Sequence, residues 1–218
     1  MKAIIYQGGW DGHTPVESAA VFAKELRARK FKVDVVNKVD ALLDVKKLKT
    51  YDLVVPMWTM ADAATITNDH VKNLSDAVRS GVGLAGWHGG MGDSVRHSLN
   101  YMWMTGGQFI DHPHVGDYIV RVIDHDHPAT AALPYAFAYK SEQYYMAFEP
   151  SIDVLAVTDY CWDGDVVEMP VVWTKHWGKG RVFYSALGHI AQEFTDYPHV
   201  REMITRGLVW AAEGKALA

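Results

Sequence analysis

The sequence predicts an α/β fold with a mostly parallel central sheet and added β-strands in its second half. Two observations predict the parallel part: short apolar runs alternate with amphipathic helical segments as far as Tyr101, and glycine-rich or polar loops follow the runs. Because βαβ units are right-handed, this alternation places the strands side by side in one sheet. The third observation is that the predicted strands between residues 118 and 185 follow one another without helices between them.

The first half is expected to hold four strands, at residues 3–6, 32–36, 52–56 and 82–85. The first helix begins at Thr14, an N-cap followed by Pro15 and Glu17, and it ends near Lys30. A short helical segment is expected over residues 42–48. A longer helix opens at Thr67 and is closed by Gly81.

The second half is expected to hold five strands, at residues 118–123, 136–139, 154–158, 171–174 and 182–185. Trp177-Gly-Lys-Gly180 separates the last two strands, which favours a hairpin. The segment Gly106–His114 is expected to be a polar loop, and Pro198–Glu213 a closing helix. Because no linker, repeat or low-complexity segment interrupts the chain, residues 1–218 are predicted to form a single domain.

The composition is that of a globular protein, with 49% hydrophobic and 22% charged residues. A formal charge of -5 without a Lys/Arg cluster argues against nucleic acid as a partner. The single Cys161 excludes an internal disulfide and fits a reducing compartment. Because no apolar run is long enough for a signal peptide or a membrane span, we expect a cytoplasmic protein without membrane association.

The segment Val82–Ser94 gives the strongest functional indication. Its buried strand ends in Gly86-Trp-His-Gly-Gly90, and Asp93 and Ser94 are expected to cap a helix reaching about Tyr101. A strand, a sharp glycine turn and a helix form the geometry of a nucleophile elbow, which holds a reactive group in a strained conformation. Here that group is His88 instead of serine or cysteine. The alternative is a core histidine bonded to backbone.

Histidines are frequent, and five of the eleven lie in predicted loops after strands: His13, His88, His112, His114 and His189. Neutral imidazoles and a carboxylate such as Glu142 suit zinc or another divalent ion if they converge. No spacing forms a local metal motif, and Asp124–His127 is expected to be a solvated turn. The chain lacks Gly-x-Gly-x-x-Gly, so no nucleotide cofactor is expected.

These motifs, taken in order, resemble ThuA-type proteins of trehalose utilisation, in the class I glutamine-amidotransferase-like superfamily. The resemblance rests on the His13 loop, Gly86–Gly90, Gly106-Gly-Gln-Phe109 with His112, Glu142 with Tyr144, and Gly180–His189. It implies a flavodoxin-like three-layer sandwich. Glutaminases of the superfamily carry an elbow cysteine and a later His-x-Glu. Here His88 replaces the cysteine and Ala191 the glutamate, so glutamine amidotransferase activity is excluded.

ThuA relatives are associated with an oxidoreductase that makes 3-keto derivatives of trehalose and related disaccharides. The resemblance therefore implies an enzyme that isomerises, eliminates or hydrolyses a 3-keto-glycoside. A carbonyl at C3 acidifies the neighbouring C–H bonds, so a histidine base suffices, and a divalent metal would polarise the carbonyl. Zinc or manganese is the candidate cofactor.

The expected residue roles follow from the resemblance together with the positions of the loops. The candidate catalytic residues are His88, Glu142 and His189, and the candidate metal ligands are His88, His112 and His189, with His13 a weaker member. The candidate substrate-binding residues are Trp58, Trp87, Gln108 and Tyr144. Trp58 and Trp87 are chosen because aromatic side chains at strand ends can line a pocket.

The expected partners are a small-molecule sugar and, through the pathway, a sugar dehydrogenase, and a homo-oligomer is left open. A second hypothesis is a non-catalytic sugar-binding or regulatory protein on a degenerate glutaminase scaffold, since the cysteine and the triad acid are missing. A third is a metal-dependent hydrolase of an unrelated small molecule, because a fold does not fix a function.

Overall fold

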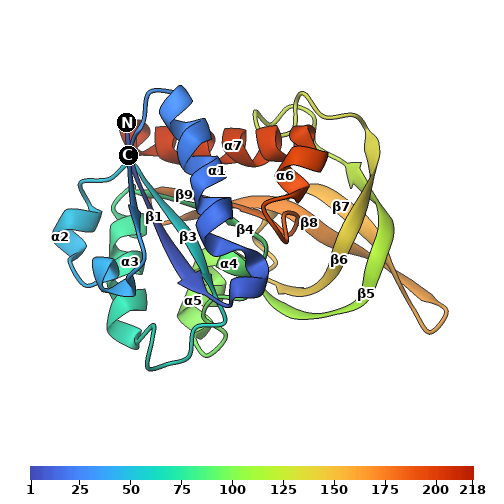
Figure 1. The fold of residues 1–218 in the computed structure, drawn as a ribbon, viewed down its shortest axis with the longest axis horizontal. Helices are drawn as coiled ribbons and strands as arrows, with labels where there is room; N and C mark the ends of the chain where they lie inside the picture. Colours follow the sequence, from blue (N-terminus) through green and yellow to red (C-terminus); the bar gives the residue numbers. More distant parts are fainter.

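The computed structural model describes residues 1–218 as one nine-stranded sheet with helices on both faces (Figure 1). The strands are β1 (Lys2–Gly9), β2 (Lys32–Val36), β3 (Leu53–Thr59), β4 (Gly83–Trp87), β5 (Gly107–Val122), β6 (Ala136–Phe148), β7 (Asp153–Trp162), β8 (Asp165–Trp177) and β9 (Gly180–Ser185). The helices are α1 (Pro15–Ala28), α2 (Val45–Leu48), α3 (Asn68–Arg79), α4 (His88–Gly92), α5 (Leu99–Thr105), α6 (Glu193–Asp196) and α7 (Pro198–Glu213), with 3-10 turns at Asp11–His13, Val39–Leu42 and Gly214–Leu217.

The sheet is mixed, so the expectation of a mostly parallel sheet is wrong. Its order is β2-β1-β3-β4-β9-β8-β7-β5-β6. The pairs from β2 to β9 are parallel, whereas all pairs from β9 to β6 are antiparallel. The physical reason is the connectivity, because short turns join β7 to β8 and β8 to β9. Only antiparallel neighbours can be joined in this way, since parallel strands need a long crossover.

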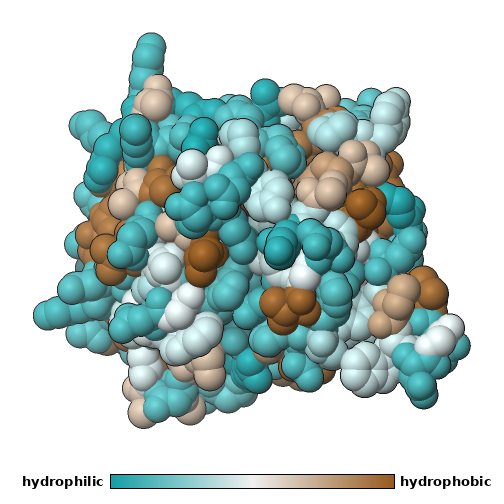
Figure 2. Space-filling view, turned by 45° about the vertical axis from the view of Figure 1, so that its right-hand side comes forward, coloured by the Kyte–Doolittle hydropathy of each residue, from teal (hydrophilic) through white to brown (hydrophobic).

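Helices cover both faces of the parallel half. The helices α1 and α7 pack together on one face, against β1, β4 and β9, and α3 and α5 lie on the other (Figure 1). A single apolar core of 58 buried residues lies between these layers. On the face shown in Figure 2, apolar residues form separate patches among hydrophilic ones. None of the helices has the length and apolar character needed to span a bilayer.

Two further local expectations are wrong. The segment expected to be the polar loop Gly106–His114 belongs mostly to β5, which pairs with β6 along its length. The single helix expected after Asp93 is replaced by α4 before it and α5 after it. Ser98 caps α5 by accepting a hydrogen bond from the Tyr101 amide at 3.3 Å. Asp93 does not N-cap a helix, because its carboxylate accepts a hydrogen bond from Arg96; it is instead the C-cap of α4, where its amide donates to the Gly89 carbonyl.

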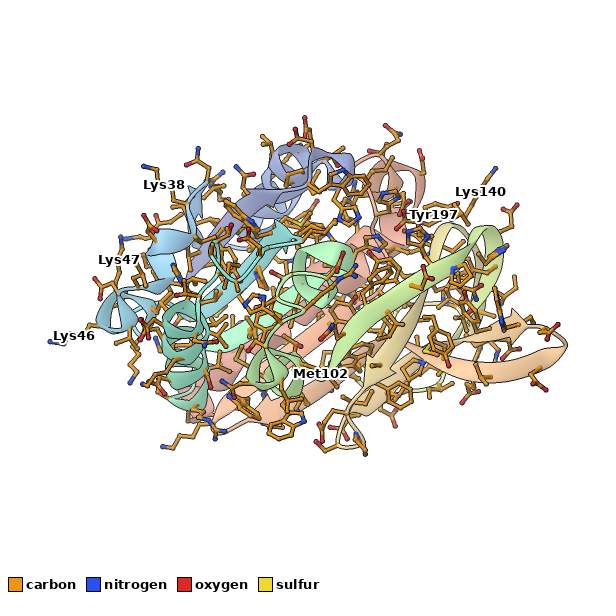
Figure 3. The ribbon with its side chains drawn as sticks, turned by 90° about the horizontal axis from the view of Figure 1, so that it is seen from below. Lys38, Lys46, Lys47, Met102, Lys140 and Tyr197 are labelled. Atoms are coloured by element: carbon orange, nitrogen blue, oxygen red, sulfur yellow. The ribbon has the colours of Figure 1, made fainter.

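A tyrosine fixes the antiparallel half to the helical layer. Tyr197, directly before α7, accepts a hydrogen bond from the Lys140 amide of β6 at 3.2 Å, and its ring packs against Tyr139 with centroids 4.4 Å apart. Figure 3 shows Tyr197 beside Lys140, while Lys46 and Lys47 project from the opposite end of the molecule. The contact holds β6 against the residue that leads into α7.

A close approach between β4 and α7 gives a stability prediction. A Cβ atom added at Gly83 would lie 2.4 Å from the carbonyl oxygen of Ala211 in α7. Because that atom is backbone, Gly83→Ala must displace the helix, and we expect a loss of about 1–3 kcal/mol in the free energy of unfolding. Chemical denaturation measures the loss. Ala20→Ser, on the exposed side of α1, is the control and should stay within about 0.5 kcal/mol. Equal stability of Gly83→Ala and the wild type would contradict the packing described.

Candidate functional site

The turn after β4 has the strained geometry of an elbow. His88 adopts a φ of +42°, in the left-handed region that side chains rarely occupy. The two glycines that follow are required by close neighbours. A Cβ atom at Gly89 would lie 2.2 Å from Cε1 of His13, and one at Gly90 would lie 2.6 Å from Sδ of Met57. The glycines therefore let the His13 ring and β3 pack directly against the turn.

His88 is held between a backbone carbonyl and a carboxylate. Its Nδ1 lies 2.8 Å from the carbonyl oxygen of Ala186, and its Nε2 lies 3.1 Å from Oε2 of Glu142. Because a carbonyl can only accept, Nδ1 carries a proton and Nε2 faces the carboxylate. The ring is 1% exposed and stacks on Tyr144 with centroids 4.0 Å apart.

Three histidines meet because their strands are parallel. His13 follows β1, His88 follows β4 and His189 follows β9, and the carboxyl ends of parallel strands share one edge of a sheet. The ring centroid of His13 lies 4.9 Å from that of His88 and 5.0 Å from that of His189. The edge is thus a cluster of imidazoles.

The antiparallel ribbon brings a carboxylate and a fourth imidazole to this cluster. Glu142 comes from β6, and its Oε1 lies 3.6 Å from Nε2 of His189 and 3.6 Å from Nε2 of His112. His112 lies in β5 within the second of two irregularities in the register with β6, between Asp111 and His114. Bulges change the direction of the side chains they carry, and the irregularity at His112 accompanies the position of its ring near Glu142.

The donor set fits a divalent metal ion. One ligand atom from each of His13, His88, Glu142 and His189 lies within 4.8 Å of the others. The Nδ1 atoms of His13 and His88 are bonded to Thr59 Oγ1, at 2.8 Å, and to the Ala186 carbonyl. Outer partners of this kind orient ligating histidines. The buried Nε2 of His189 has no hydrogen-bond partner, which leaves a nitrogen lone pair or proton for the centre.

The electrostatics also suit a cation. Burial raises the pKa of Glu142, but the hydrogen bond with His88 and the charges of His88, His189 and His112 outweigh it and lower the pKa to about 2. Burial, with the nearby His88 and His189, lowers the pKa of His13 to about 3. Burial and His88 also lower the pKa of His189. At neutral pH the cluster therefore contains the Glu142 carboxylate and, at His13 and His189, neutral imidazoles, which are the forms that bind metals.

A cavity of about 310 Å³ opens beside the cluster. Its walls combine aromatic and apolar side chains with a few polar groups, as ligand pockets do. The lining residues are Trp10, His13, Met60, Asp93, Arg96, Phe109, His112, Glu142 and Tyr144. The Arg96 guanidinium lies 4.9 Å above the Phe109 ring and pairs with the buried Asp93.

The candidate substrate residues divide between the cavity and other positions. Tyr144 lines the cavity, whereas Gln108 does not. Trp87 is fully buried in the core, with its ring centroid 4.1 Å from that of Phe22. Trp58 lies over Gly8, whose Cβ would be 2.6 Å from the indole. Neither tryptophan lines the cavity, because Trp87 is packed in the core and Trp58 packs over Gly8.

Sequence reasoning missed several residues of the site. Trp10 directly follows β1 and packs edge-on against His13 at 4.9 Å, so its position after a strand was the available signal. Asp93 was interpreted as a helix cap, and Arg96 carried no motif. Glu193 accepts hydrogen bonds from the His189 amide at 2.9 Å and the Ser141 hydroxyl at 2.7 Å, and so fixes the His189 loop.

The pKa directions give a prediction for the metal-free protein. His13 and Glu142 have folded-state pKa values below their ordinary values of 6.5 and 4.5. As the pH falls, the unfolded chain therefore takes up protons at these groups before the folded chain does. The part of the free energy of unfolding that these groups contribute above pH 6.5 is lost as the pH falls toward 3. Denaturation in EDTA at a series of pH values should show this fall, and His13→Gln should make it shallower. His114→Gln, at an exposed position, is the control. A His13→Gln profile as steep as the wild type would contradict the assignment.

Comparisons with known proteins agree with this architecture. The family model described as ThuA, trehalose utilisation, matches residues 2–211. A ThuA-like protein from Parabacteroides merdae superposes with a TM-score of 0.78 at 20% identity, covering 98% of this chain and 90% of that one. A ThuA-like protein from Bacteroides uniformis gives a TM-score of 0.73 at 23% identity, covering 94% and 89%.

A cytoplasmic protein of Salmonella typhimurium is also similar, with a TM-score of 0.66 at 14% identity, and covers 97% of this chain and 99% of that one. At these identities the structural likeness establishes the fold. No curated protein sequence matches the chain. The match of the family model over nearly the whole length is decisive: the chain belongs to the ThuA family of trehalose utilisation.

Proposed function

We propose that this protein is a metal-dependent enzyme of sugar utilisation that acts on a 3-keto-glycoside. The observation that carries the proposal is the convergence of His13, His88, Glu142 and His189 at the carboxyl edge of the sheet, beside a cavity. Membership of the trehalose utilisation family supports a sugar as the class of substrate. The acidity of C–H bonds beside a ketone supports a reaction that begins with removal of a proton.

The four residues would hold the ion, and it would polarise the substrate carbonyl as a Lewis acid when bound. Four protein ligands would saturate a four-coordinate zinc site, whereas a six-coordinate ion such as manganese keeps positions open for a substrate. Manganese is therefore favoured over zinc. His13 replaces His112 in the ligand set that the sequence suggested.

His112 is then free to act as the acid or base. It lines the cavity, its side chain is 39% exposed, and its Nε2 lies 3.6 Å from Glu142 Oε1, outside the four-ligand group. From this position it can take the proton from the carbon next to the ketone. Returning a proton to the former carbonyl carbon, while the hydroxyl on the deprotonated carbon loses its proton to become the new ketone, gives isomerisation. Breaking the glycosidic C–O bond instead, with the departing oxygen taking up a proton to leave as an alcohol, gives elimination. Arg96 and Asp93 line the same cavity, and the proposal assigns them the binding of sugar hydroxyls.

The proposed substrate also indicates which other enzyme must act before this one. A 3-keto-glycoside arises by oxidation of a secondary alcohol, so we propose a functional link to a sugar dehydrogenase. A cytoplasmic location fits that link, and similar proteins of Salmonella typhimurium are described as cytoplasmic.

The direct test uses 3-ketotrehalose and NMR detection of products. We expect conversion by manganese-loaded protein, loss of conversion after EDTA treatment, and recovery on adding manganese. Unchanged substrate with every divalent metal, together with calorimetric binding of the sugar, would instead favour the non-catalytic sugar-binding hypothesis.

Matched variants separate the ligand role from the acid–base role. Glu142→Gln should retain less than about a tenth of the wild-type metal, because a ligand and its charge are lost. His112→Gln should keep the metal while turnover falls about 10²–10⁴-fold, the range for a lost general acid or base. His114→Gln, on the exposed side of β5, is the control for both measurements. Metal loss in His112→Gln with retention in Glu142→Gln would reverse the assignment.

A further inference from the structure

A second cavity lies on the reverse face of the β5–β6 ribbon. Successive residues of a strand point to opposite faces, so Tyr145 points away from the cluster that Tyr144 contacts. Tyr145 is 39% exposed and pairs in register with Asp111 of β5. These two residues and the β7–β8 hairpin enclose a groove of about 310 Å³, at the lower end of the range of about 300–1,000 Å³ for ligand pockets.

The groove is built from aromatic rings. The Tyr145 and Tyr160 rings meet edge to face with centroids 5.2 Å apart, and Trp162 of the hairpin contributes a third ring that is 63% exposed. An exposed tryptophan beside a cavity offers a flat apolar surface that water solvates poorly. The groove therefore favours a ligand with a flat or gently curved apolar face.

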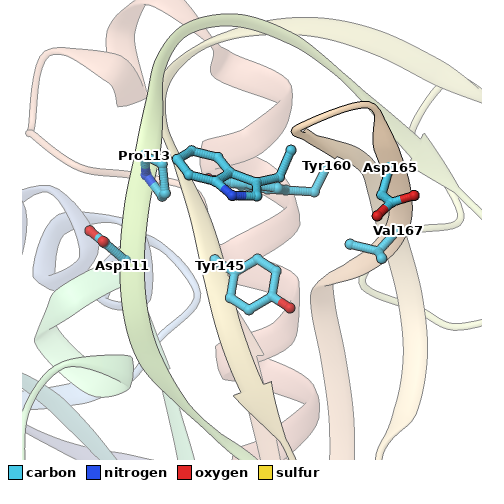
Figure 4. Close-up of a pocket in the computed structure, with 7 residues that line it drawn as sticks. Asp111, Pro113, Tyr145, Tyr160, Asp165 and Val167 are labelled. Atoms are coloured by element: carbon cyan, nitrogen blue, oxygen red, sulfur yellow. The ribbon is translucent and has the colours of Figure 1, made fainter.

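Two carboxylates occupy opposite sides of the groove. Figure 4 shows Asp111 on β5 and Asp165 on β8, with Tyr145 between them. One oxygen of Asp111 accepts the His112 amide at 2.8 Å, which fixes the carboxylate and leaves its other oxygen for a ligand. No Lys, Arg or His lines the groove, so nothing there would neutralise an anion. Because the two carboxylates are separated by the rings, a single small cation would not pair with both.

We infer that this groove is an accessory binding site for a neutral saccharide. A pyranose has an apolar face of C–H groups that stacks on aromatic rings, and hydroxyl groups around its rim that donate to carboxylates. Aromatic rings in the middle and acceptors on two sides match both features. The site needs no metal, and it is separated from the His/Glu cluster by the thickness of one strand, since Asp111 and His112 are adjacent.

The test titrates the full chain with trehalose and follows saturation-transfer NMR and calorimetry. The Glu142→Gln variant is the background, so that binding in the central cavity does not mask the groove. We expect trehalose to bind in this background and Trp162→Ala or Asp111→Asn to weaken binding about tenfold or more. Trp103→Ala removes another exposed tryptophan, on α5, and should leave the affinity unchanged.

Tetramethylammonium and inorganic phosphate are the cationic and anionic probes, and neither should compete with trehalose. The inference is overturned if Trp162→Ala and Asp111→Asn bind trehalose as tightly as the background, or if tetramethylammonium displaces it. Because turnover is not measured, failure of the groove is distinguishable from failure of the proposed reaction. Circular dichroism confirms that each variant is folded.

Discussion

The buried carboxylate of Glu142 organises the site. It is 9% exposed and lies 3.1 Å from His88 and 3.6 Å from both His112 and His189. An uncompensated buried charge costs several kcal/mol, so the fold must supply positive or hydrogen-bonding partners around it. The histidines come from the parallel half and the β5–β6 ribbon, so the two halves of the sheet meet through this carboxylate. A bound cation would satisfy the same requirement more fully.

Rigid surroundings keep the strained His88 in place. The left-handed backbone of His88 is held by the Tyr184 hydroxyl, which donates to the His88 carbonyl at 3.2 Å, while the Ala186 carbonyl fixes the ring. Both partners come from β9 or the residue after it. Glu193 then fixes the His189 loop beyond the same strand. A strained backbone conformation persists at a functional site when the surrounding contacts hold it in place. The contacts around His88 hold this turn in that way.

The parallel half could be predicted from sequence because its pattern is local. Its structure is indicated by signals that depend only on residues close in sequence: the apolar runs, the Thr14–Pro15 helix start and the glycines around His88. Because the strands are parallel, their ends then bring His88 and His189 to one edge of the sheet. The antiparallel half could not be predicted equally well. The Gly106–His114 segment looks like a loop because its inward residues alternate irregularly across bulges. Which tryptophan reaches the cavity depends on side-chain direction, which no pattern reports, so Trp10 was missed and Trp87 was misplaced.

The most direct measurement is anomalous diffraction from crystals of the metal-loaded protein, collected at the absorption edge of the ion. With zinc as the probe ion, one strong peak is expected among His13, His88, Glu142 and His189, about 2.0–2.2 Å from their ligand atoms. A peak bound elsewhere on the chain, or no peak at this edge of the sheet, would contradict the central claim that these residues form a metal centre.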